Sequence, residues 1–443
     1  MRLPELMQHQ LDGIKFLEDH NGCGLLAASC GVGKTLMALE YIRRTGSFPL
    51  LVIAPVSLLG MWRAEIERWY GWTTITIRGT PETRREAYKT SAQVYLVGYE
   101  TFRQDKVALS SFPLPPKSCI ADESGKARTP TAKISKALRM FLPPVRIALD
   151  GTPVSNSLAD LWSPVEWVAP GTFMGNWWSF RKVFAIMNPY IPGKIDGWRE
   201  QDKIIATANK HIFWKKKQDV LRDLPPLTMQ DIPLEPSDEE RATYKKIKEE
   251  LRVQILGEDM PIPNALALLM RLRQAANGAW NDKPSKITAT VELIEALPSD
   301  EKVVIFTQFE TVVQQLLRAL PYPCVAITGA HSAEERETAL HRFEHDAAVR
   351  VLVMTSAGER GNNVQCAAYM IQYDLPWSNA SQEQRIGRIW RHGQLKPCLV
   401  YNLLMQGTVD MHMKRILERK RSLAEEVYED KIVTRQDIED ILA

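Results

Sequence analysis

Short runs of apolar and β-branched residues recur along the first half of the chain, each bounded by polar turn residues. They are PLLVIAP (49–55), QVYLVGY (93–99), SCIADE (118–123) and VRIALDG (145–151). Continuous apolar runs of this length are typical of strands buried on both faces of a parallel sheet. Segments with helical spacing lie between them, as in residues 57–69, whose apolar positions fall on one face. Strands that alternate with helices predict an α/β sheet with right-handed crossovers.

A second series of apolar runs begins after residue 300. Its members are KVVIFTQ (302–308), CVAITG (324–329), RVLVMTS (350–356), AYMIQYD (368–374) and PCLVYNLL (397–404). We therefore expect two parallel α/β sheets in one chain. The region between the two series, roughly residues 155–295, is rich in Trp, Lys and Leu and has helical spacing interrupted by prolines. This pattern predicts helical outgrowths around a linker between two lobes.

Composition narrows the class of protein without deciding its function. The 443 residues are 45% hydrophobic and 25% charged, as in a globular protein of two or three domains, and the net charge of +3 identifies no partner. The six cysteines form no CxxC pair, which favours reduced cysteines over a zinc site or a disulfide frame. The first residues lack the apolar core of a secretion signal, and no uncharged run approaches the ~18 residues of a membrane span. We expect a cytoplasmic protein.

The stretch SCGVGKT (29–35) resembles a loop that binds phosphate. Gly31 and Gly33 would let the backbone curl so that successive N–H groups point inward, and the helix that follows offers its positive end to an anion. Lys34 would reach the β and γ phosphates of a nucleotide, and Thr35 would ligate magnesium. The pattern GxxxxGK[ST] is incomplete, because Ala28 occupies the first glycine position. A plain glycine turn between a strand and a helix is the alternative.

An acidic pair ends one of the predicted strands. A phosphate loop needs a carboxylate that holds the metal at the end of a neighbouring strand, and Asp122 is placed in this way. Asp122 would bind the ion directly or through water, and Glu123 would orient the attacking water. A helix cap or a solvated turn is the alternative for such a pair.

A third candidate site, QRIGRIWRHGQ (384–394), lies in the second series. Arg388 and Arg391 are three residues apart, so on a helix they would share a face and could both reach a γ-phosphate. Arginine fingers of this type accelerate phosphoryl transfer by ~10³ to 10⁵. The alternative is a basic helix face exposed to solvent.

The order of these segments resembles the superfamily-two helicase-like ATPases, and within them the Swi/Snf-type double-stranded DNA translocases. The resemblance extends almost from end to end, and its most family-specific part is the middle region. The matching segments include ELMQHQLDGIKFL (5–17), LDGTPVSNSLADLWS (149–163), FMGNWWSFRKVFA (173–185), IFWKKKQDVLRDLPPLT (212–228) and SQEQRIGRIWRHGQ (381–394).

The resemblance implies two RecA-like lobes in tandem, each a parallel sheet flanked by helices, with helical protrusions between them. Lobe 1 would span residues 1–226 and carry the phosphate loop and a protrusion at about 155–226. Lobe 2 would span residues 227–443, with a helical lead-in at about 236–295, the arginine-finger motif and a closing helix that braces the lobes.

The resemblance also assigns residues to roles. Gln10 matches the glutamine that receives adenine, and Cys30, Gly31, Val32, Gly33, Lys34, Thr35 and Gly361 would complete the nucleotide site with magnesium on Thr35 and Asp122. Gly151 and Thr152 match the motif that couples hydrolysis to DNA. The expected DNA contacts are Ser57, Tyr99, Gln308, Thr328, Ser356, Asn363 and Trp377, although Trp377 could equally serve packing.

Two departures concern the coupling between nucleotide and DNA. Where the family usually has Asp-Glu-x-His, this chain has Asp122-Glu123-Ser124-Gly125, so the histidine that links the ATP site to the coupling motif is missing. Asp150 replaces a hydroxyl residue before Gly151. Neither change removes a residue with a direct chemical role.

The sequence therefore predicts a DNA-dependent ATPase. It would hydrolyse ATP with magnesium and move along duplex DNA without separating the strands, as a near-minimal, monomeric motor in a bacterial or viral setting. A strand-separating DNA or RNA helicase is one alternative. The other is a nucleotide-gated DNA-binding scaffold with little turnover, an alternative that the missing histidine supports. Protein partners are not predicted.

Overall fold

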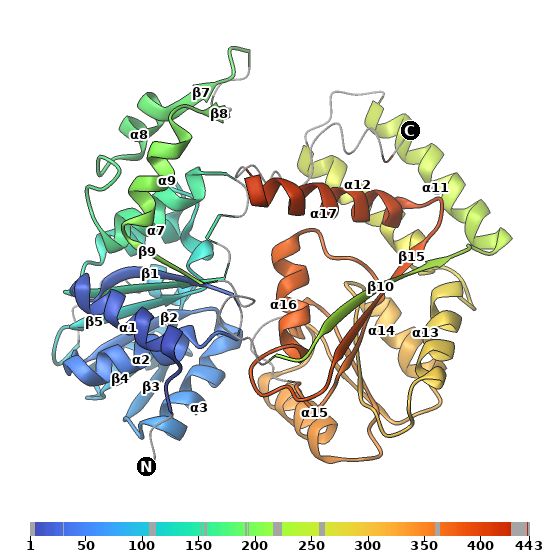
Figure 1. Cartoon of the computed structure of the whole chain (residues 1–443), viewed down its shortest axis with the longest axis horizontal. Coiled ribbons are helices and arrows are strands. Elements are labelled where there is room, and N and C mark those ends of the chain that lie inside the picture. The colour runs from blue at the N-terminus through green and yellow to red at the C-terminus, as the bar shows by residue number, and fades with distance from the viewer. Residues whose placement is uncertain are drawn as a thin grey trace. The chain divides into compact units, whose positions relative to one another are not determined.

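The chain forms two compact units, Met1–Arg222 and Asp223–Ala443, each built on its own parallel sheet (Figure 1). The computed structural model describes residues 5–29, 31–105, 112–151, 153–154, 157–190, 193, 195–215, 224–256, 262–358, 364–426 and 441. These sheets and their flanking helices confirm the predicted α/β class and the two RecA-like lobes. The two units divide after residue 222, and the predicted lobe boundary after residue 226 stays a prediction.

The sheet of the first unit has seven strands in the order β3-β4-β2-β5-β6-β1-β9, and all neighbours are parallel. The predicted apolar runs are its central strands, which are almost wholly buried and therefore lack polar positions. The strands are β1 (Cys23–Ala28), β2 (Leu50–Ala54), β3 (Thr74–Ile77), β4 (Val94–Gly98), β5 (Ser118–Asp122), β6 (Val145–Asp150) and β9 (Ile212–Lys215).

Helices flank this sheet (Figure 1). They are α1 (Gln8–Asp19), α2 (Lys34–Thr45), α3 (Leu59–Trp69), α4 (Pro81–Lys89), α5 (Tyr99–Gln104), α6 (Lys133–Met140) and α7 (Ala159–Val168). Helix α3 buries Leu59, Trp62 and Ile66 against the sheet, as its spacing predicts.

The predicted protrusion consists of α8 (Trp177–Phe184), α9 (Gln201–Asn209) and an antiparallel ribbon of β7 (Ala185–Met187) and β8 (Ile195–Trp198). Figure 1 shows these elements extending away from the sheet of the first unit. Phe180 packs at their centre, with ring centroids 5.0 Å from Phe184 and 5.6 Å from Trp198. The predicted helical protrusion is therefore present, and a short strand ribbon that the sequence did not indicate is part of its small aromatic core.

The sheet of the second unit has six parallel strands in the order β10-β15-β14-β11-β13-β12. Five of them are the predicted apolar runs. The strands are β10 (Leu227–Leu234), β11 (Val303–Phe306), β12 (Cys324–Ile327), β13 (Val351–Met354), β14 (Tyr369–Gln372) and β15 (Cys398–Met405). The sixth, β10, was assigned to a proline-punctuated linker; as an edge strand it alternates partly buried with exposed residues and tolerates Pro233.

Seven helices are described in the second unit. They are α11 (Asp238–Leu256), α12 (Ile262–Ala276), α13 (Ser285–Ala296), α14 (Glu310–Ala319), α15 (Ala333–His345), α16 (Asn379–Ile389) and α17 (Val409–Glu426). The closing helix α17 buries Val409, Met413 and Ile416 in one cluster with Leu269 and Leu272 of α12. Among the described helices of both units, none combines the length and the apolar character needed to cross a membrane.

Gly278 sits in the turn between α12 and α13 and sets their spacing. Its φ of +72° is in the left-handed region, and a Cβ there would overlap the ring of Pro284. Gly407, at φ +68°, has open space around it. Gly278→Ala should therefore lower the free energy of unfolding by about 2–4 kcal/mol, against about 1 kcal/mol for Gly407→Ala. Chemical denaturation of both variants measures this, and equal losses would contradict the steric argument.

Candidate functional site

The phosphate loop joins the end of β1 to the start of α2. Gly31 and Gly33 have φ values of +87° and +93°, and Gly33 is the N-terminal cap of α2. The Lys34 ammonium donates hydrogen bonds to the carbonyl oxygens of Ala28, at 2.5 Å, and Ser29, at 3.3 Å. The loop therefore has the tight curl, the helix N-terminus and the cation that phosphate binding requires. Cys30 lies outside the described residues.

Helix α1 supports this loop from its first turn. The Gln10 amide donates to the Val32 carbonyl at 3.4 Å, and its oxygen accepts the Met7 N–H at 3.0 Å. His9 Nε2 lies 2.9 Å from the same Val32 oxygen, and because a carbonyl only accepts, this nitrogen carries the proton. A Cβ on Gly33 would collide with the Gln10 amide. Gln10 was predicted from the sequence, whereas His9 has no motif signal and was not.

The strand ends bring the acidic residues to the same edge of the sheet. Asp122 ends β5 and Asp150 ends β6, and the register places Asp150 beside Ala27 of β1. The carboxylate of Asp122 accepts the indole N–H of Trp62 at 2.8 Å and the backbone N–H of Glu123 at 2.9 Å. Burial raises the pKa of Asp122, while the Trp62 hydrogen bond and the charge of Lys34 oppose the shift. The phosphate loop and Asp122 thus form one site.

Glu123 has an uncommon backbone conformation. Its φ of +50° and ψ of +52° place a non-glycine residue in the left-handed region, directly after β5. Such a residue costs about 1–3 kcal/mol and persists where the surrounding structure imposes it, often at active sites. The strain supports a functional role for this side chain, which is only partly buried.

Thr35 and Asp122 would hold the magnesium ion that accompanies a nucleotide. Magnesium prefers oxygen ligands, and a carboxylate offers about four acceptor positions, of which Asp122 uses two for the bonds to Trp62 and Glu123. Thr35 adds a hydroxyl in the first turn of α2. The donor set therefore fits the ion.

The arginines of the second unit do not lie as predicted. Arg388 is inside α16, is 5% exposed and donates from Nε to the Gln384 carbonyl at 3.1 Å. Helix α16 ends at Ile389, and Trp390 leaves helical geometry with φ −98° and ψ 91°. Arg391 consequently follows the helix, and the argument that both arginines share a helix face was wrong. At this helix end the indole N–H of Trp390 donates to the Pro225 carbonyl at 2.8 Å.

The expected DNA contacts fall into two groups. Ser57 and Ser356 are exposed in short 3₁₀ turns after β2 and β13, and Gln308 and Trp377 are partly buried. Tyr99 and Thr328 are buried: the Tyr99 hydroxyl donates to the Asp122 carbonyl at 2.8 Å, and the Thr328 hydroxyl lies 3.2 Å from His331 Nδ1. Neither hydroxyl is therefore available to a phosphate. Gly361, Asn363 and Thr152 lie outside the described residues, and Gly151 follows β6.

Comparison with protein families assigns both units. The model of the SNF2-related domain matches residues 9–279, and that of the helicase conserved C-terminal domain matches residues 285–393. The chain belongs to the SNF2-related family.

Relatives of this SNF2-related chain include an uncharacterized ATP-dependent helicase of Mycoplasma genitalium, 28% identical over 95% of this chain and 42% of that protein. The DNA repair and recombination protein RDH54 of Saccharomyces cerevisiae is 24% identical, over 93% of this chain and 50% of that protein. The chain spans about half the length of these curated relatives. The Sulfolobus solfataricus SWI2/SNF2 ATPase core, solved in complex with double-stranded DNA, is 26% identical, with a TM-score of 0.47 over 96% of this chain and 92% of that one.

The two departures from the family pattern meet in space. Asp150 is buried, and its Oδ2 accepts the backbone N–H of Gly125 at 2.5 Å and the Ser124 hydroxyl at 3.2 Å. A Cβ on Gly125 would lie 3.0 Å from that same oxygen. This chain lacks the linking histidine of the family pattern. Its segment after β5 is instead joined to the end of β6 by hydrogen bonds to the Asp150 carboxylate.

Trp62 is a supporting residue that the sequence analysis treated only as core. Trp62→Phe removes the hydrogen bond that favours the ionised form of Asp122, which should raise the pKa of Asp122 further and weaken metal binding. We expect the affinity for Mn²⁺, a spectroscopic substitute for Mg²⁺, to fall about tenfold in the presence of ATP, measured by electron paramagnetic resonance. Trp167→Phe is the control, because Trp167 is equally buried but donates to the Phe141 carbonyl at 2.9 Å. Equal affinities in the two variants would contradict the assignment.

Proposed function

We propose that this chain hydrolyses ATP with magnesium, is stimulated by double-stranded DNA, and steps along the duplex without separating its strands. The observation that carries the proposal is the convergence of Lys34, Asp122 and Glu123 at one sheet edge in a SNF2-related chain. The SWI2/SNF2 core that binds double-stranded DNA supports the choice of partner.

The proposed chemistry is attack of water on the γ-phosphate, giving ADP and phosphate. Lys34 binds the β and γ phosphates, and Glu123 orients the water and accepts its proton. Thr35 and Asp122 would hold the magnesium ion, which when bound would neutralise part of the phosphate charge. Gln10 supports the loop and receives adenine. Arg388 and Arg391 are assigned to stabilise the charge that develops on the γ-phosphate.

The proposed DNA contacts are Ser57, Gln308, Ser356 and Trp377. Hydroxyl and amide groups at strand ends suit phosphate oxygens, and such contacts position the protein on DNA without reading sequence. Coupling to hydrolysis is assigned to Gly151 and Thr152. The bonds from Asp150 to Ser124 and Gly125 connect that segment to Glu123. This connection argues against the scaffold with little turnover, since the missing histidine was its main support.

A strand-separating helicase is the second candidate, favoured by the name of the Mycoplasma genitalium relative. The two functions differ in what stimulates hydrolysis. Duplex DNA should suffice for a translocase, whereas unwinding of a tailed duplex at a rate that matches ATP use would show a helicase.

The test of the proposed function compares wild type with Glu123→Gln. Hydrolysis is measured without nucleic acid and with duplex DNA, single-stranded DNA or RNA, over a range of salt concentrations. Duplex DNA should stimulate the wild type most, less so at high salt because phosphate contacts are screened. Glu123→Gln should lose about 10²- to 10⁴-fold in turnover and still bind ATP and DNA.

Glu67→Gln, which removes an exposed carboxylate on α3, is the control for the Glu123 variant and should hydrolyse ATP like wild type. Loss of ATP binding in Glu123→Gln would make Glu123 structural. Absence of turnover in wild type under every condition would support the scaffold.

The two arginines should differ in their effect on folding. As an arginine finger, Arg391 should contribute about 10³-fold or more to turnover, so Arg391→Ala should lose that much activity. Arg388→Ala should lower the unfolding temperature more than Arg391→Ala, because Arg388 is buried in α16 whereas Arg391 is partly exposed. Lys396→Ala, which removes an exposed cation paired with Glu301, is the control and should retain turnover. A fall in turnover of less than about tenfold in Arg391→Ala would contradict the finger role and favour a basic side chain that is only exposed to solvent.

A further inference from the structure

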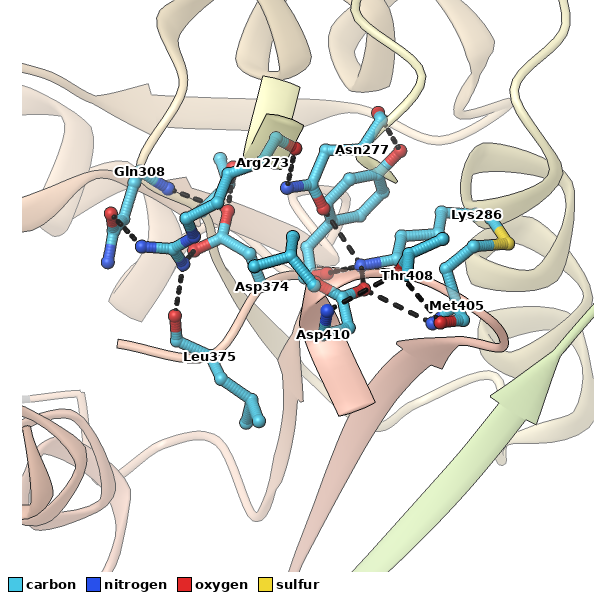
Figure 2. A network of polar contacts seen from close by, with 12 residues as sticks. Arg273, Asn277, Lys286, Gln308, Asp374, Leu375, Met405, Thr408 and Asp410 are labelled. Atoms are coloured by element: carbon cyan, nitrogen blue, oxygen red, sulfur yellow. Dashed lines mark hydrogen bonds and ion pairs between the residues drawn. The ribbon is translucent and has the colours of Figure 1, made fainter. Parts of the chain in front are cut away.

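Arg273 of α12 is a fully buried cation with contacts on several loops (Figure 2). Its Nη1 donates to the Gln308 side-chain oxygen at 2.9 Å, and its Nη2 donates to the Leu375 carbonyl. Its guanidinium carbon lies 4.5 Å from the centre of the Trp377 ring, in a cation–π contact. One side chain therefore fixes two of the proposed DNA contacts, Gln308 and Trp377, which are 69 residues apart in sequence.

Asp374 connects this cluster to the helix that carries Arg388. Its Oδ2 accepts the Thr307 hydroxyl at 2.7 Å and the Gln308 backbone N–H at 2.9 Å. Its Oδ1 lies 3.7 Å from Arg273 and 3.9 Å from Arg385 of α16, and Arg385 also donates to the Asp374 carbonyl at 2.8 Å. All three charged side chains are fully buried. Arg385 precedes Arg388 by one turn of α16.

A cluster of this kind resists partial rearrangement. Separating one charged partner would leave another buried without compensation, which is strongly unfavourable. The guanidinium of Arg273 also fixes the position of the two loops relative to each other, because its planar N–H groups bind acceptors on both loops at the same time. The loop after β11, the loop after β14 and helix α16 are therefore expected to move together.

We propose that Arg273 is a positioning residue. Together with Asp374, it couples the binding of DNA at Gln308 and Trp377 to the position of helix α16. A strand bound at Gln308 and Trp377 then sets the position of Arg388 and of the chain that follows it. The inference deepens the proposed function and rests on it, since it concerns how DNA stimulates hydrolysis. Arg273 itself touches neither nucleotide nor phosphate in this scheme.

The same unit provides a matched control. Lys286 of α13 is also fully buried; its ammonium pairs with Asp410 at 2.6 Å and donates to Asn277 at 2.8 Å and to the Tyr373 carbonyl at 2.9 Å (Figure 2). Through Tyr373 and Asn277 these contacts reach the loop after β14 and the backbone of Arg273, but they include neither Gln308, Trp377 nor α16. Removing its charge should therefore destabilise the unit without breaking the proposed connection.

The experiment measures the ratio of ATP hydrolysis with saturating duplex DNA to hydrolysis without DNA. Arg273→Lys retains a charge beside Asp374 but cannot bond to Gln308 and Leu375 together, so the ratio should fall about fivefold or more. Lys286→Met should keep the wild-type ratio within about twofold, although its unfolding temperature falls at least as far.

Hydrogen exchange provides a readout that does not depend on turnover. Exchange should rise together around Gln308 and in α16 of Arg273→Lys, and not in Lys286→Met.

A wild-type ratio in Arg273→Lys would overturn the inference. So would parallel losses in both variants that follow their unfolding temperatures, because they would assign the effect to stability. If DNA did not stimulate ATP hydrolysis by the wild type, both the proposed function and this inference would be refuted. That result would be seen in the wild type alone, so it is distinguishable from a failure of the inference, which only the variants would show.

Discussion

Parallel strands end at a common edge, and this constraint positions the chemistry of both units. In the first unit β1, β5 and β6 are neighbours, so the phosphate loop, Asp122 and Asp150 leave the sheet side by side. In the second unit β11 and β14 are neighbours, so Gln308 and Asp374 are adjacent although 66 residues apart. Side chains supplied by distant segments thus meet because strand direction is uniform.

Each unit then uses a buried carboxylate to fix the loop next to it. The Asp150 carboxylate accepts hydrogen bonds from the Gly125 backbone N–H and the Ser124 hydroxyl. The Asp374 carboxylate accepts them from the Gln308 backbone N–H and the Thr307 hydroxyl. A buried carboxylate without such partners would be costly, so both loops are held in the geometry that satisfies it. The two acidic residues therefore act as anchors: one lies beside the proposed hydrolytic residue, and the other lies beside a proposed DNA contact.

The sequence was most informative where burial on both faces left an unbroken apolar run, and every such run is a strand. It missed the edge strands β3, β9 and β10, although it found the edge strand β12. Strands β9 and β10 are partly polar, and β10 contains Pro233, which an interior strand would exclude. Spacing also misled at Arg391, because the Trp390 indole bond that accompanies the end of α16 depends on Pro225, 165 residues away. Tyr99 and Thr328 have hydroxyls suited to phosphate, but both side chains are buried. Their burial depends on packing against segments distant in sequence, which a local sequence pattern does not contain.

The departures at Gly125 and Asp150 show why residues should not be compared with a family pattern one at a time. Considered separately, Gly125 in place of the histidine removes the link between the ATP site and the coupling motif. Asp150 in place of a hydroxyl residue puts an acidic group in a buried position. Together they form one contact: Gly125 leaves space for the carboxylate, since a Cβ there would lie 3.0 Å from it, and its amide and the Ser124 hydroxyl satisfy the buried oxygen. In this chain the segment after β5 is therefore linked to the end of β6 through a backbone amide and a hydroxyl, both of which satisfy the buried carboxylate.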